Sequence, residues 1–208
     1  INKNLNLMVG FNRRFSPHVQ KVKETIGNNF MPINIIANMN AGFIPKSHWV
    51  HDLNIGGGRI IGEACHLMDI CIFLTGSMIS SVCMNGLGHS PDLDTDNVNI
   101  LLNFTNGSNA VINYFSNGSK KYSKERLEVH AQERSWIIDN YRLTKAYGVP
   151  GFRTFKTKID KGHKSQFDKY IQNIRNGGDA LIPINQIINV TRASLAAIDS
   201  LQSKKWVE

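Results

Sequence analysis

The sequence has few cysteines and no long apolar run. Its 208 residues include three cysteines, too few for a disulfide framework, and two of them, Cys65 and Cys71, fall in an apolar helix-like segment where a free thiol packs as a small hydrophobe. No apolar stretch approaches the length of a membrane span, and no charged-then-apolar secretory signal opens the sequence. We therefore expect a cytoplasmic protein that does not associate with membranes.

A dinucleotide-binding fingerprint is also lacking. Residues 56–58 are three glycines directly before a helix-like segment, but the Gly-x-Gly-x-x-Gly fingerprint requires a strand that leads into it. Here the preceding residues 51–54, His-Asp-Leu-Asn, read as a loop. We interpret the glycines as a flexible helix entry and predict that this chain contains no cofactor-binding residue.

No metal centre is indicated. His48 and His51 lie within reach of Cys65 or His66 in the sequence, but a zinc site needs three or four ligands that converge in space. Nothing beyond the spacing supports such convergence, so we predict no metal site.

The charge is unbalanced, with a formal net charge of +8. Lysines and arginines gather in residues 120–126 and again in residues 156–164, without the row of interleaved aromatic residues that a stacking platform needs and without a nucleic-acid-binding motif. We interpret these clusters as a solvated basic surface and expect no nucleic-acid partner. A phosphorylated or nucleotide-linked sugar is the other anionic partner that such an edge can favour.

The remaining pattern predicts one α+β domain over residues 1–208, built on a large, mainly antiparallel sheet with helices packed on one face. Ser16 and Pro17 mark the start of a helix that Gly27 ends, and two further helices are expected near residues 167–177 and 187–201. Expected strands cover residues 5–11, 33–40, 81–88, 97–104, 109–116, 126–131, 135–141 and 152–157. The run of short strands from residue 79 onward indicates antiparallel neighbours in chain order.

Residues 56–76 carry the most informative segment, a glycine-rich turn followed by an amphipathic helix. Helical spacing would place Glu63 and Asp69 beside His66, while the opposite side points into the core. Two flanking carboxylates would tune the pKa of His66 for proton transfer. From the residues alone, a hydrogen-bonded packing histidine is the more common alternative.

Four segments, residues 9–17, 48–69, 94–118 and 161–177, resemble the carboxy-terminal domain of the Gfo/Idh/MocA oxidoreductases, which has a fold like that of dihydrodipicolinate reductase. The resemblance implies that His66 lies near the reacting carbon of the substrate. Many members have an aspartate four residues before this histidine, whereas here that position is Gly62. A regular helix turns about 100° per residue, so Glu63 would not simply replace that aspartate.

The resemblance also implies a function. Members transfer hydride between NAD or NADP and a carbon of a sugar, sugar-nucleotide or cyclitol, and the dinucleotide is held mainly by an amino-terminal Rossmann domain that this sequence does not contain. We therefore expect the substrate-binding portion of such an enzyme, inactive on its own. The alternative is a non-catalytic oligomerisation or carbohydrate-binding module that retained the fold.

Four further residues are expected to contact the substrate. Arg14 would bind hydroxyl or phosphate groups, Trp49 would pack against a sugar ring, and Glu63 would orient the sugar. His163 precedes an expected helix and would approach the same site, with helix capping as its alternative role. Because few helices are found to cover the sheet, a homodimer or homotetramer formed through the sheet is also expected.

Overall fold

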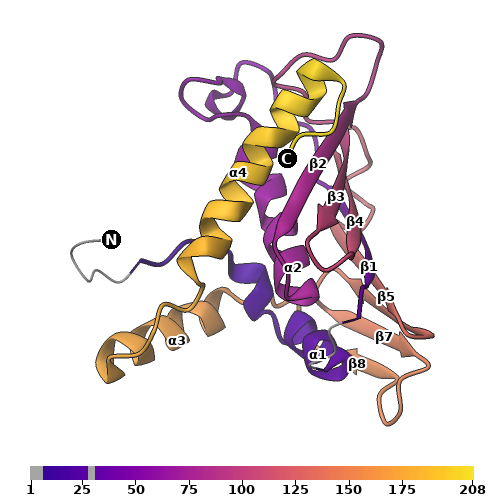
Figure 1. Cartoon of the computed structure of the whole chain (residues 1–208), viewed down its shortest axis with the longest axis vertical. Coiled ribbons are helices and arrows are strands. Elements are labelled where there is room, and N and C mark those ends of the chain that lie inside the picture. Colours follow the sequence, from indigo (N-terminus) through magenta and orange to yellow (C-terminus); the bar gives the residue numbers. More distant parts are fainter. Residues whose placement is uncertain (1–6, 28–30) are drawn as a thin grey trace.

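The computed structural model describes residues 7–27 and 31–208, which form one eight-stranded sheet with helices on one of its faces (Figure 1). The strands are β1 (Asn34–Asn40), β2 (Ile79–Gly86), β3 (Val98–Phe104), β4 (Asn109–Phe115), β5 (Glu125–Ala131), β6 (Arg134–Asp139), β7 (Leu143–Tyr147) and β8 (Thr154–Lys156). The helices are α1 (Pro17–Ile26), α2 (Cys65–Thr75), α3 (His163–Asn176) and α4 (Ile184–Ser203). Short helical turns are η1 (Asn12–Phe15), η2 (Trp49–His51) and η3 (Ile60–Ala64). The α+β fold class is confirmed.

The strand order corrects the expectation of neighbours in chain order. The sheet runs β2-β3-β4-β1-β5-β6-β7-β8, so β1 separates β4 from β5. β1 is parallel to β4 and antiparallel to β5, while every other pair is antiparallel. Alternation along a strand shows which side chains are buried but not which strand lies beside it, which is why the sequence pattern missed this insertion.

Two strand predictions also change. Residues 7–11 of the expected first strand form no strand, and residues 5 and 6 lie outside the described residues. β7 was not expected, because it is only five residues long and follows a turn in which Asn140 and Tyr141 both have positive φ. Local sequence is least informative for such short strands.

Helix boundaries follow the expected signals. The Ser16 hydroxyl accepts a hydrogen bond from the backbone N–H of His18, Pro17 occupies the first turn of α1, and Gly27 ends it. Gly76 and Gly177 end α2 and α3 in the left-handed conformation. These predicted boundaries are confirmed.

The hydrophobic core lies between the helices and one face of the sheet. The interior side of β3 and β4 contributes Ile100, Leu102, Ile112 and Tyr114, and α2 contributes Met68, Ile70 and Ile72. Each of these side chains is almost fully removed from water. Burial of apolar surface is the main stabilising contribution to the folding of a domain of this size.

The other face of the sheet is open, and over β2, β3, β4 and β1 it consists of uncharged side chains. Its described residues are Ser81, Cys83, Asn85, Asn99, Leu101, Asn103, Asn109, Val111, Asn113, Phe115, Asn34, Ile36, Asn38 and Asn40. Asparagine amides form hydrogen bonds across strands, as from Asn99 to Asn113 (2.7 Å) and from Asn113 to Asn38 (2.6 Å). Charged side chains return on β5, β6, β7 and β8.

Gly162 lets the turn before α3 lie directly on the backbone of η1. Its φ is +85°, and a Cβ atom there would lie 2.4 Å from both the Asn12 carbonyl oxygen and the Ser16 nitrogen. The Asn12 side chain also donates a hydrogen bond to the Lys161 carbonyl oxygen (2.7 Å). This contact places Lys161 and His163 against η1, which itself packs on α2.

We expect Gly162→Ala to lower the free energy of unfolding more than Gly151→Ala. Both positions have positive φ, which costs an alanine roughly 1–2 kcal/mol. A Cβ at Gly151 meets nothing within 4 Å, whereas one at Gly162 collides with backbone. Urea unfolding of the two variants measures the difference, and equal losses would show that the close approach at Gly162 is not required.

Candidate functional site

The helix that carries His66 begins with a π-helical segment, η3, before it continues as α2. Hydrogen bonds in a π turn join residues five apart, so residues around it do not follow regular helical spacing. Glu63 consequently points to the sheet, where its carboxylate accepts a hydrogen bond from the Tyr114 hydroxyl (2.9 Å) and lies 3.4 Å from Arg59. The prediction placed Glu63 beside His66 because it assumed a regular helix. In the structure, the Glu63 carboxylate contacts Tyr114 and Arg59 instead.

His66 is largely buried and lies edge-on against Phe11, with ring centroids 5.7 Å apart. Its Nδ1 atom is buried and has no hydrogen-bond partner among the described residues. Burial, followed by the charge of Arg13, lowers the pKa of His66 to about 4. The imidazole is therefore neutral at pH 7.

A buried ionic cluster centred on Glu125, at the start of β5, contains charges that act on the pKa of His66. The Glu125 carboxylate accepts two hydrogen bonds from Arg13 (2.8 and 3.1 Å), one from Lys161 (2.5 Å) and one from Tyr141 (3.0 Å). Burial alone would raise the pKa of Glu125, but the hydrogen bonds and charges of Arg13 and Lys161 lower it to about 2. Glu125 therefore stays ionised and holds both cations in place.

Arg14 has a different position from the one predicted. Its guanidinium donates to both carboxylate oxygens of Asp69 (2.9 and 2.5 Å) and to Gln186 (2.8 Å), and both members of the ion pair are buried. Asp69 is thus the partner of Arg14 rather than of His66. Arg14 ties η1 to α2 and α4, which does not support the predicted substrate contact; the arginine whose charge acts on His66 is Arg13.

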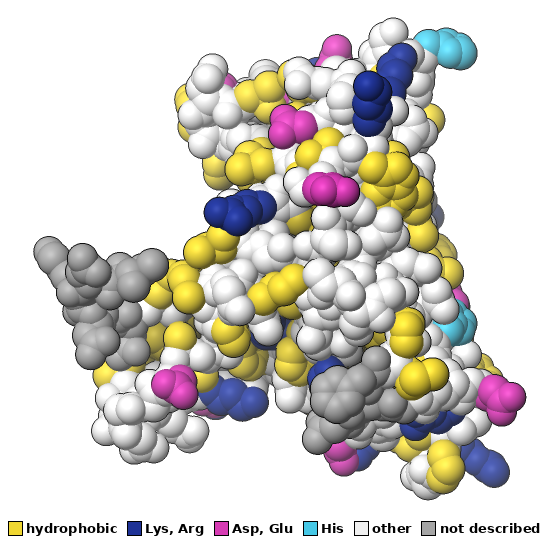
Figure 2. Space-filling model, in the orientation of Figure 1, with side chains coloured by type: hydrophobic (Ala, Val, Ile, Leu, Met, Phe, Trp, Pro, Cys, Tyr) yellow, Lys and Arg dark blue, Asp and Glu magenta, His cyan; other side chains and the backbone are white. Residues whose placement is uncertain are grey.

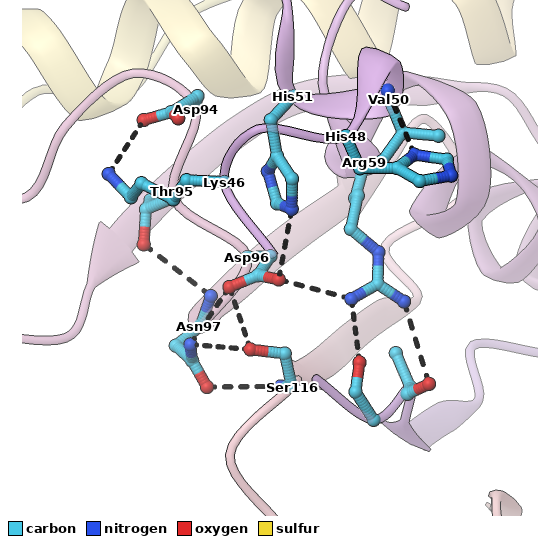
Figure 3. A network of polar contacts seen from close by, with 12 residues as sticks. Lys46, His48, Val50, His51, Arg59, Asp94, Thr95, Asp96, Asn97 and Ser116 are labelled. Atoms are coloured by element: carbon cyan, nitrogen blue, oxygen red, sulfur yellow. Dashed lines mark hydrogen bonds and ion pairs between the residues drawn. The ribbon is translucent and has the colours of Figure 1, made fainter. Parts of the chain in front are cut away.

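Trp49 lies on the loop between β1 and η3, with 60% of its surface exposed. Arg59 anchors this loop (Figure 3): it is buried, and it donates to the Gly42 carbonyl oxygen (2.8 Å) and to Asp96 (3.0 Å). His51 points to the same Asp96 carboxylate at 4.0 Å. The buried contacts of Arg59 therefore fix the base of the loop, while the Trp49 ring stays exposed to solvent on its surface.

His163 is the first residue of α3 and is exposed. A positive charge on His163 is one of the smaller causes of the lowered pKa of His66. Of the residues predicted for the site, the structure thus brings His66 and His163 into the same region. No group of three or more histidine, cysteine or carboxylate side chains that could hold a metal ion occurs within residues 7–27 and 31–208.

The site predicted from the sequence, which took Arg14 in preference to its neighbour, did not contain Arg13, Glu125, Tyr141 or Lys161. Two of them had a signal: Arg13 adjoins Arg14, and Lys161 lies two residues before His163. Glu125 and Tyr141 are isolated in the sequence, and only the fold brings them together with Arg13 through side-chain hydrogen bonds on the Glu125 carboxylate.

Comparisons with known proteins identify the family. Residues 25–137 match the GFO/IDH/MocA C-terminal domain. The chain belongs to this family of oxidoreductases. It is 29% identical over 145 residues to an uncharacterized oxidoreductase of Bacillus subtilis, covering 67% of this chain and 42% of that protein. It is 24% identical over 217 residues to an inositol 2-dehydrogenase of Rhizobium meliloti, covering 97% of this chain and 64% of that protein.

A solved structure of a levoglucosan dehydrogenase in complex with NADH and levoglucosan has a similar fold. Its TM-score is 0.79 at 19% identity, and the match covers 99% of this chain and 66% of that one. The chain spans less than two-thirds of the length of the two curated relatives described above. None of the described helices is both long and apolar enough to cross a membrane.

We expect His66 to remain neutral down to about pH 4 in the folded protein. Its unfolded pKa is near 6.5, so between these values the unfolded chain binds a proton that the folded chain does not. His66 therefore makes the free energy of unfolding fall as pH falls through this window, and His66→Gln should remove that part of the dependence. Titration of the imidazole resonances by NMR measures the pKa directly, and a value near 6.5 would contradict the site described here.

Proposed function

We propose that this chain is the substrate-binding part of an NAD(P)-dependent oxidoreductase acting on a sugar, sugar-nucleotide or cyclitol. The observation that carries the proposal is a neutral histidine with a free, buried ring nitrogen beside two fixed cations. His66 accepts the proton of the substrate hydroxyl when the carbon is oxidised and returns it in the reverse direction. Arg13 and Lys161 stabilise the negative charge that develops on that oxygen.

The nicotinamide, when bound, accepts or supplies the hydride. In this proposal the dinucleotide is held mainly by the portion of the full-length enzyme that the chain does not cover. Figure 2 shows hydrophobic side chains over α3 and the start of α4. The exposed hydrophobic residues of these two helices include Phe167, Ile171, Ile174, Ile184 and Ile188, each more than one-third exposed. This apolar surface supports a contact with that portion.

In the full-length enzyme, we expect His66→Ala to lower turnover by about two to four orders of magnitude, because a positioned acid or base is lost. Affinity for the dinucleotide should change little. Steady-state kinetics and the melting temperature are measured together, so that a loss of folded protein is not mistaken for a loss of chemistry.

Two other histidines provide controls. His89 is exposed, and His89→Ala should leave both turnover and melting temperature unchanged. His18 is buried and hydrogen-bonded to Thr144 and Thr157, so His18→Ala should lower the melting temperature while the folded enzyme stays active. Near-normal turnover of folded His66→Ala would refute the catalytic role and favour a non-catalytic module.

We also propose that the protein self-associates through the open face of the sheet. The uncharged half of that face is unusual in a chain of which 19% of the residues are charged. Asparagine amides both donate and accept hydrogen bonds, so two copies related by a two-fold axis can satisfy one another without burying a charge. The apolar row of Ile36, Val111 and Leu101 supplies the area to be buried.

We expect Leu101→Asp to convert the oligomer to monomer, because a carboxylate in the centre of the interface would be desolvated without a partner. Leu195→Asp on α4 is the matched control: Leu101 is 40% exposed and Leu195 is 49% exposed. Multi-angle light scattering reports the mass. A monomeric unmodified protein across a wide concentration range would overturn the proposal.

A further inference from the structure

Residues 43–57, between β1 and η3, form a strap that has few connections to the rest of the domain. Every backbone–backbone hydrogen bond that the structure describes for these residues is made within the strap. Gly42 and Gly58, which flank it, both have positive φ (+81° and +82°). Arg59 joins the two ends through its hydrogen bond to the Gly42 carbonyl oxygen (2.8 Å). The strap is therefore a compact loop that can turn as a unit about its flanking glycines.

His51 is the single buried residue of the strap, whose residues are all described. Its side chain is 4% exposed, and neither ring nitrogen has a hydrogen-bond partner among the described residues. Figure 3 shows the ring pointing to Asp96, but the distance from Nε2 to Oδ2 is 4.0 Å, too long for a direct hydrogen bond. A buried polar group without a partner is unfavourable, so a neutral His51 holds the strap only weakly.

Asp96 has an acceptor position left for His51. Its Oδ1 atom accepts hydrogen bonds from the Asn97 amide (3.0 Å) and the Ser116 hydroxyl (2.7 Å), and its Oδ2 atom accepts one from Arg59 (3.0 Å). A carboxylate has about four acceptor positions, so Oδ2 can take one further hydrogen bond. Oδ2 is also the oxygen to which His51 points. A movement of about 1 Å would bring the two groups into hydrogen-bond contact.

The neighbouring charges favour a protonated ring at this position. Arg59 contacts two carboxylates, those of Asp96 (3.0 Å) and Glu63 (3.4 Å), so its single positive charge does not offset both. A hydrogen bond between two charged groups is about twice as strong as one between neutral groups, so protonated His51 would bind Asp96 more tightly than the neutral ring. The other titratable side chains in or beside the strap are Lys46 with its partners Asp92 and Asp94, the exposed His48 and Asp52, and Lys120 next to Gly42.

We propose that residues 43–57 are a pH-controlled strap, which protonated His51 closes onto Asp96 and which neutral His51 releases. Release lets the strap turn about Gly42 and Gly58 while Arg59 keeps its two ends together. Trp49 lies on the same helical turn as His51 and is fixed or freed with it. The inference depends on the contacts of the strap and not on the proposed reaction.

The test is solution NMR of the full-length protein labelled with ¹⁵N-tryptophan and ¹³C-histidine. Histidine is the side chain that ordinarily changes its charge between pH 5 and pH 8, so both labels are followed across this range. We expect the order parameter of the Trp49 backbone N–H to fall from about 0.85 at pH 5 to below about 0.6 at pH 8. The midpoint should coincide with that of the His51 ring signals. Trp136, fully buried in β6, is the rigid reference.

His51→Gln cannot take up the proton, so the strap should be mobile at every pH. His48→Gln is the matched control, because His48 is exposed beside the same turn and its replacement should leave the pH dependence unchanged. The proposal is overturned if the mobility of Trp49 is equal at pH 5 and pH 8, if its midpoint differs from that of His51, or if His51→Gln keeps the pH dependence. The first two outcomes come from the unmodified protein, so a poorly folded variant would not prevent a decision.

Discussion

The convergence of three donors on Glu125 is the constraint on which the site depends. Arg13, Tyr141 and Lys161 come from η1, the turn after β6 and the turn before α3, and they meet on one carboxylate of β5. A buried carboxylate with incomplete partners is costly, so these segments are stable only when they are together. Breaking such a pair by removing one partner typically costs about 3–5 kcal/mol.

Adjacent arginines extend this constraint from the sheet to the helices. Arg13 pairs with Glu125 on β5, and Arg14 pairs with Asp69 on α2. Consecutive side chains of η1 thus reach opposite layers of the domain, and the short turn is held between them. The position of His66 relative to the cations therefore depends on the Arg13–Arg14 dipeptide and on the carboxylates of Glu125 and Asp69 with which it pairs.

Much of this architecture could be predicted from the sequence, because it depends on local signals. Ser16, Pro17, Gly27 and Gly177 mark helix ends through their own backbone preferences, and the helix bearing His66 is evident from its apolar spacing. The π turn of η3, in which Glu63 contacts Tyr114, was not predictable in this way. Tertiary contacts, rather than local propensity, decide such details.

The same distinction separates the predicted and unpredicted parts of the site. His66 and His163 belong to segments that resemble the family, whereas Glu125 and Tyr141 have no local pattern. Choosing between Arg13 and Arg14 required knowing that Asp69 is buried beneath Arg14. Adjacent identical side chains differ only in the partners that the fold brings to them.

The insertion of β1 divides the sheet into two blocks with different folding requirements. β2, β3 and β4 form a meander, and so do β5, β6, β7 and β8, but each block meets the other only through β1. Each meander closes through local hairpins, whereas β1 must pair with β4 across 75 residues of chain, from Asn34 to Asn109. Such non-local pairing is slow to form because loop closure costs entropy before contacts compensate it. β1 is therefore the strand whose pairing joins the two meanders into one sheet, so that they fold as one cooperative unit.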